Sequence, residues 1–433
     1  MIRDLLIVSG GTITGTISVP GDKSISHRAA LFAALANGPG DITGFLESAD
    51  TDALLAALAA LGIRIERTPE TVRIHGRGAA RWDDPEGDLD LGNSGTALRL
   101  LAGVLAGRGV RATLTGDASL RTRPMQRIVE PLQRMGAVIS AREGTPPVVL
   151  GGGALRGVTH PVPATSAQVV SCLLLAGLHA DGETWVARAP GVRDHTERML
   201  AHFDIPLQRD NGRLGVTGCE WDAVAARPIA VPRDPSAAAF FAVAAALVPG
   251  AEVTLPGLCA NPTRTGFAAV LGRMGAEVGW AGIDDAGAEP VGTLHVHGRA
   301  LQGVRISAAE VPTLIDELPA LMVAAAYAKG RTVVAGAAEL RHKESDRIAT
   351  MAAMLSALGV EVRETPDGVE IEGGRLRGGT VDARHDHRVA MAAAVAALGA
   401  DGPVTIRNCA EIATSFPGFA ATARAAGMEV AEG

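Results

Sequence analysis

The sequence is poor in aromatic residues and in cysteine, and each shortage narrows what the protein can be. Aromatic side chains make up 3% of the 433 residues, against 47% hydrophobic residues and 53 glycines. This mix is typical of helices packed on sheets through small side chains, and it argues against disorder. The cysteines, at positions 172, 219, 259 and 409, show no C-x-x-C spacing. They predict neither a disulfide framework nor a zinc site, and they favour a reducing, cytoplasmic location.

The sequence also lacks an excess of positive charge and lacks long apolar runs. The formal net charge of −7 argues against nucleic acid or a membrane surface as the main partner. The longest apolar stretch, "AAAFFAVAAALV" from Ala237, is shorter than the roughly 20 residues that cross a bilayer. The beginning, "MIRDLLIVSGG", is too short and too soon interrupted for a signal peptide. We therefore expect a cytoplasmic protein that binds small molecules.

Several common catalytic motifs are absent. No G-x-x-x-x-G-K-[ST] occurs, which excludes a P-loop, and "GGTITG" and "GGGALRG" lack the Rossmann spacing. The sequence also contains no G-x-S-x-G motif, so it does not predict the nucleophile of an α/β-hydrolase. The "HDH" at residues 385–387 is flanked by arginines, so we favour packing and hydrogen bonding there over metal ligation.

The chain repeats one pattern six times, at intervals of about 70 to 80 residues. Each copy reads as a strand or polar turn, an alanine-rich helix, a Gly- or Pro-containing break and a β-branched strand. The copies begin at Ile17, Leu91, Val162, Ile229, Val311 and Ala383.

A second helix follows in each copy, and in five copies it ends in a similar phrase. The phrases contain Gly62, Gly136, Gly275, Gly359 and Gly427. A glycine there predicts a helix C-cap, and the residues after it predict a strand. The remaining copy, "RMLAHFDIPL", lacks the glycine. One unit is therefore a βαβαββ piece, and the chain belongs to the α/β class.

Six such units divide into two domains of three. We predict an N-terminal domain over residues 20–231, and a second domain that combines residues 1–19 with 232–433. The two crossings, at about residues 19–20 and 227–232, would form a hinge. Because ligands favour clefts between domains, we expect the active site in the cleft.

Basic residues gather near the starts of the repeats, although the protein is acidic. The groups are Lys23, His27 and Arg28; Arg121, Arg123 and Arg127; Arg193, His195 and Arg198; Arg341, His342, Lys343 and Arg347; and Arg384, His385, His387 and Arg388. Any single group fits helix caps and surface ion pairs equally well. Five groups in register favour a strongly positive cleft, built from helix N-termini, for a small ligand with several negative charges.

Eight phrases in order resemble the 5-enolpyruvylshikimate-3-phosphate (EPSP) synthase family. They are "PGDKSISHR", "GNSGTALR", "RTRPMQR", "SAQ", "RDHTERM", "IDELP", "KESDR" and "HDHRVAM". The resemblance covers nearly the whole chain and implies an inside-out α/β barrel with two domains of three βαβαββ units. It also implies the family's reaction in aromatic amino-acid biosynthesis. In that reaction the 5-hydroxyl of shikimate 3-phosphate receives the enolpyruvyl group of phosphoenolpyruvate, and phosphate is released.

The resemblance further implies that the protein is a monomer, that it requires no metal or organic cofactor, and that it is the target of glyphosate. It assigns the site residue by residue. Shikimate 3-phosphate would be bound by Lys23, Ser24, Arg28, Ser166, Gln168, Asp316 and Lys343. Phosphoenolpyruvate would be bound by Lys23, Gly95, Arg123, Gln168, Arg347 and Arg388. Asp316 would be the general base for the 5-hydroxyl, Glu344 a second acid/base group for C3, and Lys23 a catalytic cation.

Alternatives remain for some of these residues and for the function. Asp316 and Glu317 precede an apolar helix, where acids favour the helix dipole without any catalytic role. A UDP-N-acetylglucosamine enolpyruvyl transferase is disfavoured because Ser24 follows Lys23 and no cysteine precedes Cys172. A catalytically dead anion-binding relative is disfavoured because the acid/base residues persist.

The chain departs from the most familiar family pattern at three positions. These are Leu100, Ala167 and Thr414, and they resemble a branch that often tolerates glyphosate. Gly95, in contrast, leaves room for the inhibitor. We expect intermediate sensitivity.

Overall fold

A computed structural model describes residues 5–433, apart from the side chains of residues 162–164, within the repeat copy predicted from Val162. Residues 1–4 of the predicted second domain lie outside the described residues. The chain divides into two compact units. Unit 1 comprises the residues up to Asp22, Pro232–Asp285 and Pro290–Gly433, and unit 2 comprises Lys23–Val231 and Ala286–Glu289. Across residues 5–433, no helix is both long and apolar enough to cross a bilayer.

Six α-helices belong to unit 2, and three of them form its core. Every residue of α1 from Ile25 to Leu35 is buried, including the polar Ser26, His27 and Arg28, as expected for an inner helix surrounded by other elements. The inner helices are α1 (Lys23–Leu35), α3 (Gly95–Arg108) and α5 (Ala167–Gly177). The outer helices are α2 (Ala49–Ala60), α4 (Gln126–Arg134) and α6 (His195–His202).

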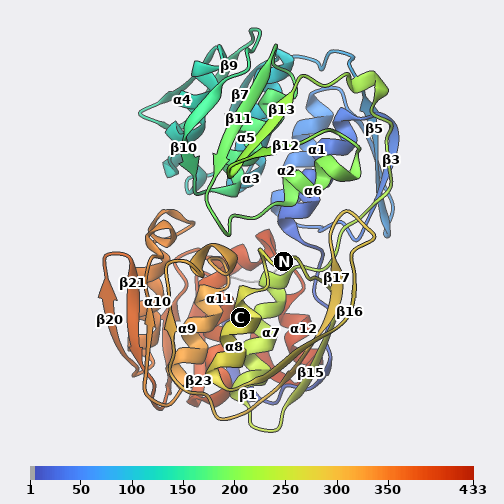
Figure 1. The fold of residues 1–433 in the computed structure, drawn as a ribbon. Coiled ribbons are helices and arrows are strands. Elements are labelled where there is room, and N and C mark those ends of the chain that lie inside the picture. The colour runs from blue at the N-terminus through green and yellow to red at the C-terminus, as the bar shows by residue number, and fades with distance from the viewer. Residues whose placement is uncertain (1–4) are drawn as a thin grey trace. The chain divides into compact units, whose positions relative to one another are not determined.

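Three four-stranded sheets cover these helices (Figure 1). In the strand orders given below, the first strand of each sheet pairs in parallel with the second, and the two remaining pairings are antiparallel. The first contains β14 (Ile229–Ala230), β3 (Asn37–Thr43), β5 (Thr71–Arg77) and β4 (Arg64–Arg67). The second contains β6 (Leu89–Asp90), β7 (Arg111–Thr115), β9 (Thr145–Gly151) and β8 (Ile139–Arg142). The third contains β10 (Thr159–Ala164), β11 (Glu183–Arg188), β13 (Arg213–Thr217) and β12 (Gln208–Asp210).

Unit 1 repeats the plan. Its inner helices are α7 (Pro235–Leu247), α9 (Leu318–Tyr327) and α11 (His387–Ala396), and its outer helices are α8 (Gly266–Met274), α10 (Arg347–Ala357) and α12 (Phe419–Ala425). One sheet contains β2 (Gly15–Thr16), β15 (Glu252–Cys259), β17 (Val291–His297) and β16 (Glu277–Asp284). The next contains β18 (Arg305–Ile306), β19 (Arg331–Val334), β21 (Gly368–Glu372) and β20 (Glu361–Thr365). The last contains β22 (Arg377–Asp382), β23 (Asp401–Arg407), β1 (Leu5–Gly11) and β24 (Met428–Glu432). The predicted sixfold α/β repeat is confirmed.

Two short strands pair away from the helix that follows them in sequence. Strand β2 precedes α1 of unit 2 but pairs in parallel with β15 of unit 1. Strand β14 precedes α7 of unit 1 but pairs in parallel with β3 of unit 2. The N-terminal β1 lies between β23 and β24, antiparallel to both. The last sheet of unit 1 therefore contains strands from both ends of the described chain, β1 and β24.

The glycines that end the outer helices have left-handed backbone conformations. Gly62, Gly136 and Gly275 have φ of 82°, 97° and 110°, and the corresponding glycines of the last two repeats also have positive φ. The predicted C-caps are therefore confirmed. In the copy without glycine, Asp204 takes the same role with φ 54°. Aspartate is among the few residues that tolerate this region, which explains why the repeat keeps its shape without the glycine.

Candidate functional site

The first turn of α1 carries two of the predicted binding residues of unit 2, Lys23 and Ser24. Lys23 begins the helix, and its Nζ lies 3.0 Å from Oδ2 of Asp50, in the first turn of α2. The side chains of Lys23 and Asp50 are 15% and 6% exposed, so this ion pair is largely shielded from water. Ser24 is half-buried beside them. Sequence reasoning missed Asp50, because a carboxylate in a helix's first turn ordinarily needs no partner.

Arg28, one turn further along α1, is held by neutral oxygens. Its Nε donates to Thr196 Oγ1 at 2.8 Å and its Nη2 to Ser171 Oγ at 2.7 Å, while Nη1 donates to the Ser24 carbonyl at 2.9 Å. The side chain is buried, at 2% exposure. These contacts fix a planar cation beside Ser24, and they come from residues as far as 168 positions away in the sequence.

The N-terminus of α3 brings Gly95 and Arg123 together. Ser94 caps the helix by accepting a hydrogen bond from the Ala97 N–H. Arg123, 7% exposed, follows the short helix η1 (Leu120–Thr122) and donates to Oδ1 of Asn93. A Cβ atom on Gly95 would lie 3.3 Å from Nη1 of Arg123. The glycine thus lets a guanidinium approach the helix N-terminus closely.

Arg99, which the sequence did not single out, connects this turn to Gln168. Its Nη1 donates to Gln168 Oε1 at 2.7 Å and to the Gly95 carbonyl at 3.2 Å. The amide of Gln168 donates in turn to Thr96 Oγ1 at 2.7 Å. Gln168 lies in the first turn of α5, two residues after the N-cap residue Ser166. The predicted residues Gly95 and Gln168 therefore share one arginine.

The predicted site residues of unit 1 form a second cluster, centred on Arg347. Oδ1 of Asp316 lies 3.4 Å from Nζ of Lys343 and 3.4 Å from Nη1 of Arg347. Oε2 of Glu344 accepts from Nη2 of Arg347 at 2.5 Å. Arg347 is 1% exposed, whereas the carboxylates of Asp316 and Glu344 are 14% and 16% exposed. Both predicted acid/base groups thus rest on one buried guanidinium and remain partly exposed.

Asp386, the N-cap of α11, completes this cluster. Its Oδ2 accepts from Nε of Arg347 at 2.8 Å, and its Oδ1 accepts from the Arg388 backbone N–H at 2.9 Å. The Arg388 side chain donates to the Asp316 carbonyl at 2.9 Å. Burial by itself would lower the pKa of Arg347. The negative charges of Asp386, Glu344 and Asp316 outweigh this effect and raise the pKa above its ordinary value. The guanidinium therefore stays charged.

The expectation of a strongly positive site does not describe the cluster of unit 1. Its three cations are matched by three carboxylates: Lys343, Arg347 and Arg388 against Asp316, Glu344 and Asp386. The sequence showed the cations because they stand in register. It did not show that the carboxylates between them are paired with those same cations.

Other predicted basic groups have local partners. His195 Nδ1 lies 2.6 Å from Glu289 Oε1, and both side chains are fully buried. His385 lies 3.0 Å from Glu411. Among the residues that the structure describes, no group of three or more His, Cys, Asp or Glu side chains is arranged to hold a metal ion.

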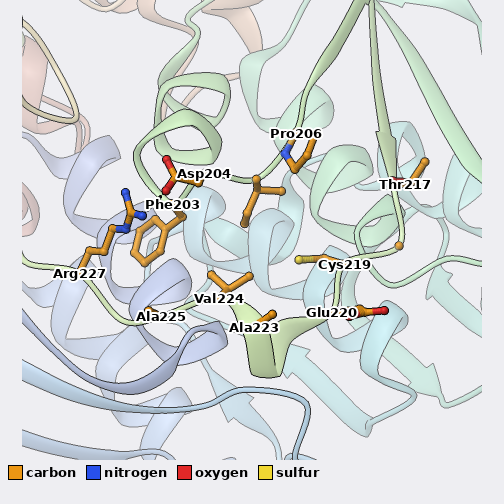
Figure 2. A pocket seen from close by; sticks show the side chains of 12 residues that line it. Phe203, Asp204, Pro206, Thr217, Cys219, Glu220, Ala223, Val224, Ala225 and Arg227 are labelled. Atoms are coloured by element: carbon orange, nitrogen blue, oxygen red, sulfur yellow. Dashed lines mark hydrogen bonds and ion pairs between the residues drawn. The ribbon is translucent and has the colours of Figure 1, made fainter.

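A pocket of about 340 Å³ lies elsewhere in unit 2 (Figure 2). Phe203, Ile205 and Val224 supply apolar walls, and Cys219 and Arg227 also line it. None of the predicted binding residues is in its lining. The pocket is therefore separate from the clusters described above.

Comparison with known proteins agrees with the sequence resemblance. The model of the family described as EPSP synthase (3-phosphoshikimate 1-carboxyvinyltransferase) matches residues 7–422. A 3-phosphoshikimate 1-carboxyvinyltransferase of Methylococcus capsulatus is 50% identical over 424 residues, which cover 97% of each chain. One of Xanthomonas campestris pv. campestris is 50% identical over 422 residues, with 97% of this chain and 96% of the other covered.

Solved structures give the same result. The structure of EPSP synthase from Acinetobacter baumannii has a TM-score of 0.86 at 43% identity, with 99% of both chains covered. The enolpyruvyl transferase NikO from Streptomyces tendae, at 19% identity and a TM-score of 0.76, shares the fold. The predicted inside-out α/β architecture is confirmed by these similarities. The chain belongs to the EPSP synthase family.

Proposed function

We propose that this chain transfers the enolpyruvyl group of phosphoenolpyruvate to the 5-hydroxyl of shikimate 3-phosphate, with the two clusters dividing the work. The hydroxyl oxygen bonds to C2 of phosphoenolpyruvate while C3 accepts a proton. The tetrahedral adduct then loses phosphate and a C3 proton, which restores the double bond. The observation that carries the proposal is the Arg347 cluster, because two carboxylates there share a fixed cation.

Proton transfer is assigned to unit 1. Asp316 is the general base for the 5-hydroxyl, and Lys343 and Arg347, both 3.4 Å from its Oδ1, hold that oxygen in place. Glu344 handles the proton at C3. Its contact with Arg347 orients the carboxylate and leaves one edge partly accessible to substrate.

Substrate binding draws on both clusters. Phosphate and carboxylate groups suit bidentate guanidinium forks, which supports arginines as the principal ligands. Shikimate 3-phosphate is assigned to Lys23, Ser24, Arg28, Ser166, Gln168, Asp316 and Lys343. Phosphoenolpyruvate is assigned to Lys23, Gly95, Arg123, Gln168, Arg347 and Arg388. In this assignment the Lys23–Asp50 pair must open enough for Lys23 to contact both substrates.

We further propose a cytoplasmic monomer that uses no metal or organic cofactor. Its domains are residues 20–231 and residues 1–19 with 232–433, joined by a hinge at about 19–20 and 227–232. The acidic composition and the cysteine usage support the location. Domain movement would admit the substrates and exclude water during the reaction.

The direct test measures phosphate release from phosphoenolpyruvate with and without shikimate 3-phosphate, in EDTA. We expect release that needs both substrates and survives EDTA. Asp316→Asn should abolish most of it, whereas the exposed Glu372→Gln serves as a matched carboxylate control in the same unit. Release by the wild-type chain from phosphoenolpyruvate alone, or none with both substrates, would refute the proposal.

A further inference from the structure

One fully buried histidine connects α1 and α3, two of the helices that carry predicted ligands in unit 2, and the mechanism above does not use it. His27 lies on α1, one turn after Lys23, and is 0% exposed. Its Nδ1 is 2.6 Å from the Lys23 carbonyl, and its Nε2 is 2.9 Å from Oγ of Ser94, which is 1% exposed.

The hydrogen bonds of His27 have only one consistent direction. A carbonyl oxygen can only accept, so Nδ1 carries the hydrogen and donates to Lys23. Nε2 then has the lone pair and accepts from the Ser94 hydroxyl, whose oxygen accepts from the Ala97 N–H at 3.2 Å. Burial lowers the pKa of His27 to about 4, so the ring is neutral near pH 7 and this arrangement persists.

Each end of this chain of hydrogen bonds adjoins a predicted substrate ligand. At one end is Lys23, assigned to both substrates. At the other end, Ser94 stands between Gly95 and Asn93, and the Asn93 side chain accepts from Arg123. The ring therefore sets the spacing between the cation on α1 and the phosphoenolpyruvate ligands at the start of α3.

We propose that His27, acting through Ser94, is a positioning residue that fixes Lys23 relative to Gly95 and Arg123. This inference rests on the proposed function, because it concerns ligands assigned to that reaction. Displacing a binding group by about 1 Å can cost roughly 100-fold in rate, so a small shift of α1 against α3 is enough to impair the site. A purely structural role would lower stability and leave substrate binding unchanged.

Two conservative variants separate the two contacts. In His27→Asn the shorter amide can still donate to the Lys23 carbonyl but does not reach Ser94. In His27→Gln the longer amide can reach Ser94 but cannot also bond to Lys23. If both contacts are needed, each variant raises KM for phosphoenolpyruvate and the Kd of shikimate 3-phosphate by about ten-fold or more, with a smaller change in kcat.

Ser94→Ala provides a second route, since it removes the hydroxyl and leaves the ring in place. The double variant Ser94→Ala/His27→Gln should be no worse in KM than the more impaired single variant, because both changes break the same link. The control is His179→Ala. His179 is a half-buried histidine of unit 2, which accepts from Trp221 and packs at the far end of α3 near Gly107. The variant His179→Ala should lower the urea midpoint without changing KM.

Kinetics would be measured where urea melts show each variant to be folded. Wild-type KM in either His27 variant, or in Ser94→Ala, would overturn the inference. So would a rise in KM for His179→Ala equal to that of the His27 variants. A wild-type chain that makes no product from the two substrates would instead refute the proposed function, so the two failures are distinguishable.

Discussion

The two clusters hold their arginines in different ways, although Lys23 of unit 2 is paired with the carboxylate of Asp50. In unit 2, Arg28, Arg99 and Arg123 donate to hydroxyl, amide and carbonyl oxygens, which carry no formal charge. In unit 1, Arg347 donates to three carboxylates. Hydrogen bonds to such oxygens orient a guanidinium without neutralising its charge. Carboxylate partners neutralise it and are themselves fixed in position.

This difference suggests a division of labour. An enzyme that joins two anionic substrates needs excess positive charge to bind them and ionisable groups to move protons. We propose that the arginines of the unit 2 cluster mainly bind the anions and that the carboxylates of the unit 1 cluster mainly move the protons. Substitutions in unit 2 should therefore affect mainly binding, and those at the carboxylates of unit 1 mainly the chemical step.

The strongest test of this division is Asp316→Asn. The amide keeps the size of the side chain but cannot accept the hydroxyl proton, so kcat should fall by about 100- to 10,000-fold. The Kd of shikimate 3-phosphate, measured by calorimetry, should change little. A fall in affinity as large as the fall in kcat would break the comparison.

Acidification should destabilise unit 2. Burial lowers the pKa of His27 to about 4 and that of His179 to about 3, whereas the unfolded rings titrate near 6.5. Below pH 6.5 the unfolded chain thus binds more protons, so the free energy of unfolding falls as the pH drops. His27 alone should contribute a loss of about 3 kcal/mol between pH 6.5 and 4.

Urea unfolding at pH 7, 5.5 and 4.5 would measure this loss. Trp82, Trp185 and Trp221, three of the chain's four tryptophans, lie in unit 2 and report its unfolding by fluorescence. His179→Gln should flatten the dependence. A midpoint that stays constant over this range would contradict the prediction.

Arg28→Lys should weaken binding of shikimate 3-phosphate. Lysine keeps the charge but cannot reproduce the planar fork that donates to Thr196, Ser171 and the Ser24 carbonyl. Loss of one charged hydrogen bond, about 2 kcal/mol, corresponds to a rise in Kd of roughly 30-fold. Arg227→Lys, at an exposed pair with Asp204, is the matched control. If kcat fell while Kd held, Arg28 would belong to the chemical step.

Gly95→Ala should affect phosphoenolpyruvate and glyphosate unequally. The added Cβ would stand 2.8 Å from Nη1 of Arg99 and 3.3 Å from Nη1 of Arg123, so both side-chain ends must shift. One extra carbon in a binding site discriminates by roughly ten-fold or more, and we expect the glyphosate inhibition constant to rise more than KM for phosphoenolpyruvate. Equal constants before and after the change would show that space at Gly95 does not control inhibition.

The smallest expected effect is a gain in stability from Asp204→Gly. The left-handed conformation at φ 54° strains an aspartate by about 1 kcal/mol, and glycine adopts it freely. The lost pair with Arg227 is exposed and contributes little. A urea midpoint below that of the wild-type chain would mean that the pair outweighs the strain.

The repeat could be predicted because each copy shows its own periodicity and five of the six copies carry a glycine at the end of the second helix. The predicted domain boundaries place β2 in the second domain and β14 in the first, but their partner strands β15 and β3 could not be identified from the local pattern alone. Strand β14 lies within "IAVP", whereas β2 lies directly before the nearly identical "ISVP", so the letters do not distinguish the sheets that the two segments join. The exchange is decided by long-range packing.

The site was predictable only for residues that stand in register or in a family motif. Asp50, Ser171 and Thr196 lie 27 to 168 positions from the cations they contact, and nothing in their spacing marks them. Asp386 stands in the "HDH" motif that the sequence analysis considered, but the arginines on either side of that motif did not predict that Asp386 accepts a hydrogen bond from the distant Arg347.

The placement of β1 has a consequence for synthesis on the ribosome. Leu6 and Val8 are fully buried between β23 and β24, which are translated last. Residues 23–231 can emerge and fold while β1 still has no partner. A nascent chain therefore carries an exposed apolar strand for most of translation, and we expect this strand to be the segment that chaperones bind.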